Sequence, residues 1–220
     1  MDFQTIVKKS ILAGMLISFG CIFSMVVSPY GAIAKGICFS VGLFGVMCCD
    51  AYLFTGSILK IRKVWDKREE AIQLIIFWLQ VWFWNCIGSL IMVVVAYILG
   101  YDSSSMAIVK ASLPWYSVIL RGILCNVMVC LSVYIYNRAK AFLGIASINA
   151  IASVILPVSC FVICGFEHSI ANMFYMPLSF IYGGISLVTC ISNILLATVG
   201  NLIGGIAFSW LIFEKREELW

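Results

Sequence analysis

Long apolar stretches separated by short polar breaks fill almost the whole chain of 220 residues. A transmembrane helix needs about 20 consecutive apolar residues. Six spans are predicted on this basis, at residues 11–29, 33–61, 71–99, 116–136, 142–180 and 185–213. The second and fifth stretches are too long for one simple crossing, so we expect a break in each. The pattern predicts an all-α integral membrane protein with no room for a soluble domain.

Composition agrees with this class. Hydrophobic residues make up 63% of the chain and charged residues 11%, with a mean hydropathy of +1.08. A soluble domain carries about twice that share of charged residues. The net charge of +4 comes from basic residues in short loops and not from a patch interleaved with aromatic residues. No nucleic-acid partner is therefore expected.

The basic residues predict the orientation in the membrane. If the N-terminus is cytoplasmic, only Lys35, Lys110 and Arg121 face the outside. Eleven others face the cytoplasm: Lys8, Lys9, Lys60, Arg62, Lys63, Lys67, Arg68, Arg138, Lys140, Lys215 and Arg216. Short cytoplasmic loops carry an excess of Lys and Arg. We expect a multi-pass protein of the cell membrane with both termini in the cytoplasm.

Polar residues interrupt two of the apolar stretches. Asp50 lies in the second, and Glu167, His168 and Asn172 lie in the fifth, where His168 is the only histidine of the chain. A polar group in a membrane loses water without a guaranteed partner, and such residues usually face a cavity or pathway. This placement indicates transport across the membrane.

Similar spacings suggest an internal duplication. Asp50 and Glu167 are 117 positions apart. The segments Asn85-Cys86-Ile87-Gly88 and Asn201-Leu202-Ile203-Gly204 are 116 positions apart. A duplicated unit of three spans runs in opposite directions in its two copies, which gives inverted repeats. We expect one transmembrane channel domain over residues 1–220, with repeats at roughly 1–105 and 106–220.

Ten cysteines lie in apolar surroundings without paired C-x-x-C spacing. This distribution predicts buried free thiols and neither a metal site nor a cofactor. The small residues Gly88, Gly122, Gly200 and Gly204 are interpreted as positions where helices pack closely.

One segment, Gly165-Phe166-Glu167-His168-Ser169-Ile170-Ala171-Asn172-Met173-Phe174, resembles the signature of the formate/nitrite transporter family. The resemblance continues in order through nearly the whole chain, at residues 36–43, 50–55, 122–131 and 200–205. It implies an aquaporin-like protomer of six helices in a homopentamer, with a pore in each protomer and the second and fifth helices broken at its centre.

The resemblance also assigns the pore residues. Phe39 and Phe161 resemble an outer constriction, and Leu43 and the loop residue Leu53 resemble an inner one. Thr55 lies beside that loop.

Between the constrictions, His168 and Asn126 correspond to the polar pair that meets the permeating species. Glu167 and Asn172 resemble groups that brace the broken helix, with Asp50 as a further supporting residue. Lys110 resembles a lysine of the outer vestibule. Arg121 either lines that vestibule or extends outward along its stem, and the second arrangement is favoured.

The implied function is a channel or transporter for small monovalent weak-acid anions such as formate, nitrite, hydrosulfide or short monocarboxylates, with formate or hydrosulfide favoured. A bare anion would lose its hydration at great cost between two apolar rings, whereas a neutral acid crosses readily. We therefore expect coupling to protons through His168. Direct conduction of the anion past a charged histidine stays open. The alternatives are a transport-inactive sensor or scaffold in the membrane, and a polytopic enzyme that uses the buried histidine.

Overall fold

The computed structural model describes residues 2–64, 67–143 and 148–213, and within these ranges every regular element is a helix. In this part of the chain four helices are long and apolar enough to cross a membrane. They are α1 (Phe3–Val26), α5 (Arg68–Ile98), α7 (Trp115–Leu143) and α10 (Leu187–Ile212). The predicted all-α fold of a membrane protein is confirmed.

The second and fifth apolar stretches each form separate helices on either side of a break. In the second, α2 (Ala32–Cys48) is followed by a non-helical segment and then by α3 (Phe54–Ser57), η2 (Ile58–Lys60) and α4 (Ile61–Val64). In the fifth, α8 (Ile148–Ile163) and α9 (Ser169–Ile181) are separated in the same way. The breaks cover residues 49–53 and 164–168.

Several boundaries differ from those predicted. Helix α1 begins at Phe3 instead of residue 11, because the Asp2 carboxylate caps it by accepting a hydrogen bond from the Thr5 N–H at 3.2 Å. Phe142 belongs to α7 and not to the fifth stretch. Helices thus continue beyond the apolar core of a span, where polar residues reach water. Lys215 and Arg216 lie outside the described residues.

Two short helices were not predicted. The connection between α1 and α2 contains η1 (Ser28–Tyr30). Helix α6 (Ser104–Ala111) lies between α5 and α7, and the Asp102 carboxylate accepts a hydrogen bond from the Ser104 N–H at its start, at 2.8 Å. Its eight residues are too few and too mixed in polarity to stand out beside the long apolar stretches.

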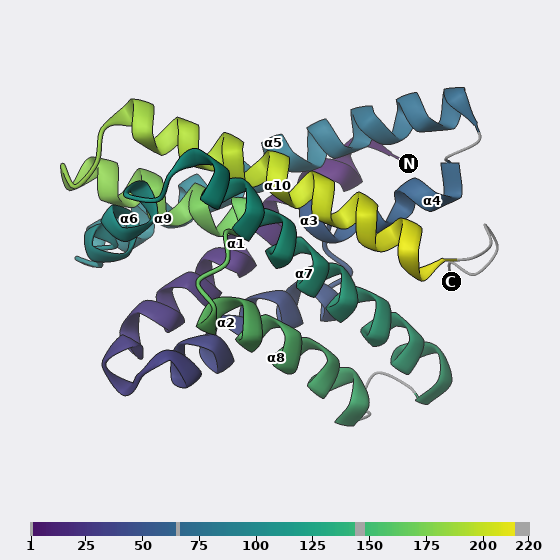
Figure 1. The fold of residues 1–220 in the computed structure, drawn as a ribbon, viewed down its shortest axis with the longest axis horizontal. Coiled ribbons are helices and arrows are strands. Elements are labelled where there is room, and N and C mark those ends of the chain that lie inside the picture. The colour runs from purple at the N-terminus through teal and green to yellow at the C-terminus, as the bar shows by residue number, and fades with distance from the viewer. Residues whose placement is uncertain (1, 65–66, 144–147, 214–220) are drawn as a thin grey trace.

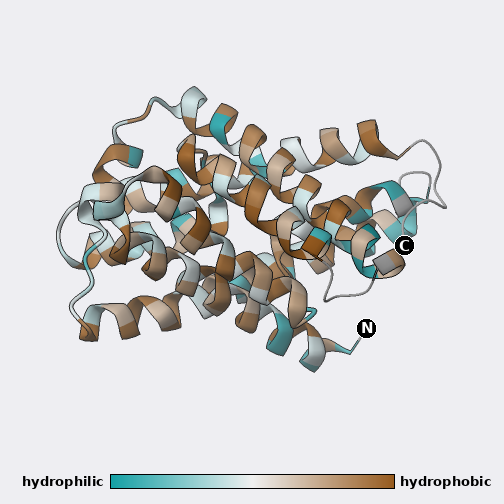
Figure 2. Ribbon diagram, turned by 90° about the horizontal axis from the view of Figure 1, so that it is seen from below, coloured by the Kyte–Doolittle hydropathy of each residue, from teal (hydrophilic) through white to brown (hydrophobic). Residues whose placement is uncertain are grey.

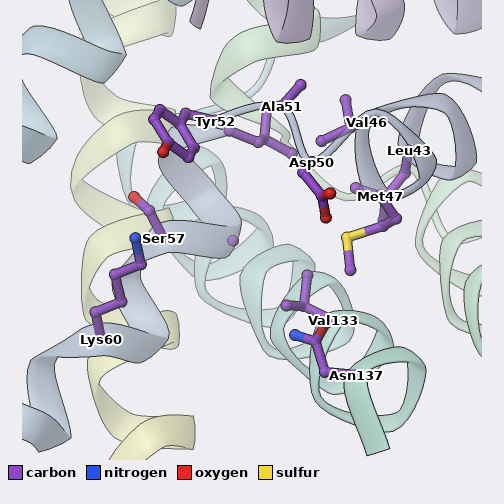
Figure 3. Close-up of a pocket in the computed structure, with 12 residues that line it drawn as sticks. Leu43, Val46, Met47, Asp50, Ala51, Tyr52, Ser57, Lys60, Val133 and Asn137 are labelled. Carbon is purple, nitrogen blue, oxygen red and sulfur yellow. The ribbon is translucent and has the colours of Figure 1, made fainter. Parts of the chain in front are cut away.

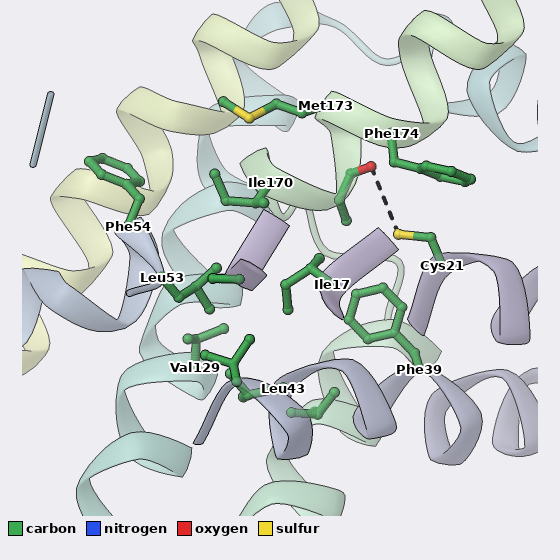
Figure 4. Close-up of a cluster of buried hydrophobic side chains, with 14 of the residues drawn as sticks. Ile17, Cys21, Phe39, Leu43, Leu53, Phe54, Val129, Ile170, Met173 and Phe174 are labelled. Carbon is green, nitrogen blue, oxygen red and sulfur yellow. Dashed lines mark hydrogen bonds between the residues drawn. The ribbon is translucent and has the colours of Figure 1, made fainter. Parts of the chain in front are cut away.

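The helices form one bundle in which α2 and α8 pack side by side (Figure 1). The start of α1 and the end of α10 lie at one end of the bundle, and α6 with the connection between α9 and α10 lies at the other (Figure 1). Ile17, Leu43, Leu53, Val129 and Ile170, which come from α1, α2, the first break, α7 and α9, form part of a buried apolar cluster (Figure 4).

The outer surface of the bundle is apolar. On α5, Ile76, Leu79 and Phe83 share one face and are 50%, 64% and 50% exposed. Hydrophobic residues extend along most of the length of the helices (Figure 2). A soluble monomer rarely exposes so much contiguous apolar surface. This surface fits contact with lipid or with neighbouring subunits.

Glycines allow the closest approaches between helices. A Cβ added to Gly88 would overlap the carbonyl oxygen of Ile11, and one added to Gly204 would overlap that of Ile123. Gly200 likewise lies against the Ile119 carbonyl oxygen. The predicted packing role of these small residues is confirmed.

All ten cysteines lie in described residues and are free thiols. The prediction of burial is wrong for Cys48, Cys49, Cys160 and Cys164, which are exposed in the protomer. Apolar neighbours in the sequence do not imply burial here, because much of the outer surface of the bundle is itself apolar.

Candidate functional site

A buried asparagine on α5 holds the first helix break. The Asn85 Oδ1 accepts a hydrogen bond from the Phe54 N–H at 2.9 Å, at the start of α3. Its Nδ2 donates to the carbonyl oxygens of Ser10 and Tyr52, both at 2.8 Å. One side chain therefore satisfies the first N–H of α3 and a carbonyl of the broken segment.

A second asparagine, on α10, holds the other break with the same set of bonds. The Asn201 Oδ1 accepts from the Ser169 N–H at 2.8 Å, at the start of α9. Its Nδ2 donates to the carbonyl oxygens of Gly122 and Glu167, both at 2.8 Å. Asn85 and Asn201 are both fully buried. Non-helical backbone within a membrane needs such partners, because no water is available to it.

These bonds give a register for comparing the two breaks. Tyr52 corresponds to Glu167, and Asp50 corresponds to Gly165; Asp50 and Gly165 have positive φ angles of 48° and 64°. The spacing that matched Asp50 with Glu167 is therefore wrong by two positions. The Asp50 Oδ1 lies 3.2 Å from the Lys140 Nζ in an exposed pair, so its carboxylate has no part in bracing the histidine.

His168 caps α9 with its side chain. The Ala171 N–H donates to the His168 Nδ1 at 3.1 Å, and Nε2 lies 3.1 Å from the Thr55 Oγ1. Because Nδ1 accepts a hydrogen bond, the ring proton of the neutral imidazole is on Nε2. This Nε2–H donates to the Thr55 hydroxyl oxygen. Phe161 stacks on the histidine ring, with centroids 5.9 Å apart.

Asn126 lies on the other side of Thr55. Its Nδ2 donates to the carbonyl oxygens of Thr55 at 3.3 Å and Asn201 at 2.6 Å, which sets the orientation of the amide. The Asn126 Oδ1 is buried and has no hydrogen-bond partner among the described residues. Since the Thr55 oxygen already accepts the His168 proton, its own O–H remains available as a donor. The site thus presents one free donor and one free acceptor.

Glu167 is held by two side chains. Its Oε1 accepts a hydrogen bond from the Lys110 Nζ at 2.9 Å, and its Oε2 accepts one from the Asn172 Nδ2 at 2.6 Å. The Asn172 Nδ2 also lies 2.7 Å from the Asn193 Oδ1. Lys110 is brought here by α6, which is tied to α9 by the bond from the Ser103 hydroxyl to the Tyr175 carbonyl oxygen, at 2.7 Å. Neither the contact of Asn193 nor the pairing of Lys110 with Glu167 was predicted from the sequence.

A cavity of about 420 Å³ opens above this site, on the side of α6. Phe39, Phe161 and His168 are part of its lining, and the two phenylalanine rings meet edge to face with centroids 5.6 Å apart. Its cations are Lys35, Lys110 and Arg121, the three basic residues that the sequence placed outside.

Arg121 points into this cavity. Its Nη1 donates to the Gly165 carbonyl oxygen at 2.9 Å, in the second helix break, and its Nε donates to the Ser117 Oγ at 3.3 Å. The favoured prediction that Arg121 extends outward is therefore wrong. The carbonyl of the broken segment attracts the guanidinium inward.

A smaller cavity of about 230 Å³ lies along the first helix break (Figure 3). Leu43, Leu53, Asp50, Tyr52 and Lys60 are part of its lining. Phe39 and Leu43 are one turn apart on α2, so a single helix contributes to both cavities. Thr55 is hydrogen-bonded to both His168 and Asn126. Of the predicted constriction residues, Phe39 and Phe161 line the larger cavity, and Leu43 and Leu53 line the smaller one.

Known proteins with similar sequences are described as transporters or channels. A family model described as formate/nitrite transporter matches residues 1–214. The chain is 31% identical to a protein described as a probable formate transporter of Methanothermobacter thermautotrophicus, over 92% of this chain and 85% of that protein. It is 30% identical to the formate channel FocA of Escherichia coli (strain K12), over 94% of this chain and 86% of that protein.

Two solved structures have the same fold. One is described as an FNT family ion channel and superposes with a TM-score of 0.82 at 23% identity, covering 93% of this chain and 87% of the other. The second is described as a pentameric formate channel with formate bound, with a TM-score of 0.77 at 24% identity, covering 97% and 98%.

The asparagine contacts predict a large effect of Asn201→Leu on stability. This change leaves one N–H and two carbonyl groups without their partner, and each buried group that is left unpaired costs about 1–3 kcal/mol. We expect a strongly lowered midpoint of thermal unfolding in detergent. Asn149→Leu is the matched control, because Asn149 is exposed on α8. Unfolding of both variants at the wild-type temperature would show that Asn201 does not hold the break.

Proposed function

The chain belongs to the formate/nitrite transporter family. From this membership we propose that it is a membrane channel for small monovalent weak-acid anions and that their transport is coupled to protons. Formate is the leading substrate, because two relatives at 30% identity or more are described as formate transporters or channels. The observation that carries the proposed mechanism is the pair of free groups beside His168, the Thr55 hydroxyl and the Asn126 Oδ1.

The proposed architecture has six crossings in two inverted repeats, at residues 1–105 and 106–220. Helices α2 to α4 form the second crossing, and α8 with α9 forms the fifth. The matched bonds of Asn85 and Asn201 support this assignment. Gly88 and Gly204 add to it, since each lies against a carbonyl of the first helix of its own repeat.

The proposed pathway runs from the larger cavity to the smaller one. An anion enters the larger cavity, where Lys35 and Arg121 raise its local concentration. It then passes between Phe39 and Phe161, meets Thr55, Asn126 and His168, and leaves past Leu43 and Leu53. The burial of all four constriction residues supports their proposed role, because a closed apolar ring excludes hydrated ions.

The chemistry of the chamber favours a neutral acid over its anion. A carboxylic acid carries one O–H donor and one carbonyl acceptor, which match the Asn126 Oδ1 and the Thr55 hydroxyl. A carboxylate has only acceptor oxygens, and one of them would face the unpaired Asn126 oxygen. The permeating anion therefore takes up a proton from water in the larger cavity, crosses as the acid and releases the proton in the smaller cavity.

His168 remains neutral in this mechanism. A second ring proton would sit on Nδ1, which accepts the Ala171 N–H that caps α9. Charging the ring would break this cap, so the alternative of anion conduction past an imidazolium is disfavoured. The histidine acts by directing the Thr55 hydroxyl, whose oxygen accepts the Nε2 proton.

We further propose that the chain forms a homopentamer in the cell membrane with both termini in the cytoplasm. The related structure described as a pentameric formate channel supports this assembly. The start of α1 and the end of α10 at one end of the bundle support the orientation (Figure 1). Lys35, Lys110 and Arg121 line the larger cavity. If this cavity opens to the outside, the opposite side of the membrane, which carries more basic residues, is the cytoplasmic side, as expected.

The role of the histidine predicts a pH-dependent flux. Wild-type protein in proteoliposomes should take up formate rapidly when the donor side is acidic, because protonation precedes crossing. His168→Ala removes the partner of Thr55 and the cap of α9, and we expect at least a ten-fold lower rate in stopped-flow measurements. Asn149→Ala, at an exposed site outside both cavities, should transport as the wild type does. Wild-type flux no faster than that of empty liposomes, for formate, nitrite, hydrosulfide and lactate alike, would refute transport.

The constriction predicts that Phe161→Ala admits chloride. Chloride is the anion of a strong acid and does not cross as a neutral molecule, so a closed phenylalanine pair excludes it. Removing one ring opens space for a hydrated ion, and we expect a chloride conductance in planar bilayers that the wild type lacks. Phe44→Ala on α2 is the control, because Phe44 packs against the core and lines neither cavity. If both variants exclude chloride equally, Phe161 is not part of the barrier to chloride.

A further inference from the structure

The larger cavity has more cations than its acid can balance. Its lining contains Lys35, Lys110 and Arg121, and Glu167 is the only acidic residue among them. Glu167 is occupied by Lys110 and Asn172. Neither Lys35 nor Arg121 has an ion-pair partner in the part of the chain that the structure describes. The cavity therefore carries an excess of positive charge that suits an incoming anion.

The guanidinium of Arg121 is fixed in orientation. Its Nε donates to Ser117 one turn earlier on α7, and its Nη1 donates to the Gly165 carbonyl oxygen in the helix break. A guanidinium has five N–H donors. These two bonds leave about three N–H groups, on Nη1 and Nη2, with no hydrogen-bond partner among the described residues. The side chain is half-buried, and its hydrogen bond to Gly165 is exposed, so the remaining N–H groups are accessible to an anion in the cavity.

We propose that Arg121 is a specificity-determining residue that selects planar anions with two oxygen atoms, the class of formate and nitrite, before they reach the phenylalanine constriction. A planar guanidinium presents two parallel N–H groups that match the two oxygens of such an anion. Hydrosulfide offers a single sulfur atom, which two parallel N–H groups can reach only at bent angles, and hydrogen bonds weaken as they bend. This inference rests on the proposed transport function and names the substrate class of the same pathway.

The location of Arg121 supports selection rather than general attraction. Lys35, in the first turn of α2, is a point charge that attracts every anion alike. Arg121 is bonded to Gly165, three residues before His168, so an anion held by its fork lies in the same cavity as Phe161 and His168.

The test compares KM values for formate, nitrite and hydrosulfide in proteoliposomes of the wild type and Arg121→Lys. The substitution keeps the positive charge and removes the fork. Loss of a charged, two-point hydrogen bond raises KM by about ten-fold for formate and nitrite. The KM for hydrosulfide is expected to stay within about two-fold, because a point charge attracts it as well as a fork does.

Two control variants separate this role from simpler ones. Arg138→Lys makes the same change on α7 at an exposed site outside both cavities and should leave all three KM values unchanged. Lys35→Gln removes a point charge and should raise the three values together. If Arg121→Lys also shifts all three values together, or shifts none, Arg121 only braces Gly165 or attracts anions generally, and the inference is wrong.

Wild-type protein decides the question if Arg121→Lys does not fold. Acetate carries the same two carboxylate oxygens as formate, so it can bind the Arg121 guanidinium in the same way. It is expected to inhibit formate uptake when added on the side of the larger cavity. An equal concentration of chloride is not expected to inhibit uptake. Equal inhibition by the two anions would contradict the inference. Wild-type transport of hydrosulfide alone would also contradict it, while transport of none of the anions would refute the proposed function itself.

Discussion

A helix that stops inside a membrane leaves N–H and C=O groups that no water can satisfy, and the two helix breaks of this protein depend on how that demand is met. Asn85 and Asn201 each accept a hydrogen bond from the first N–H after a break and donate two to nearby carbonyl oxygens. Both asparagines belong to long unbroken helices, α5 and α10, so the broken segments are held by hydrogen bonds to continuous helices. These contacts also position Thr55 and His168, which are adjacent to them in the chain.

The same constraint shapes the chemistry of the site. His168 supplies the acceptor for the Ala171 N–H at the start of α9, and this bond leaves the ring proton on Nε2 and directed at Thr55. Asn126 uses its Nδ2 on the Thr55 and Asn201 carbonyl oxygens, which leaves its Oδ1 free. Groups that stabilise interrupted backbone are thus the same groups that we propose meet the permeating acid. In the proposed mechanism, structural support and selectivity come from the same hydrogen bonds.

Much of this arrangement could be predicted from the sequence, because long apolar runs and the polar residues inside them are local signals. These signals predicted an all-helical membrane protein, and the observed breaks fall in the two overlong stretches. Contacts between distant segments leave no local signal. The pairing of Lys110 with Glu167 joins residues 57 positions apart through a helix too short to be predicted, and Arg121 turns inward because of a carbonyl 44 positions away. Asn85 and Asn201 were found as a repeat, but only their hydrogen bonds reveal what they do and correct the register at Asp50.

The proposed mechanism depends on the protonation of His168, which can be measured without ambiguity because it is the only histidine of the chain. Solid-state NMR of protein labelled with ¹⁵N-histidine in lipid bilayers at neutral pH distinguishes the two neutral tautomers from the imidazolium. The account predicts a neutral ring with a protonated Nε2 and an unprotonated, hydrogen-bonded Nδ1. A ring protonated at both nitrogens, or at Nδ1 alone, would mean that His168 does not cap α9 and would contradict the proposed passage of a neutral acid.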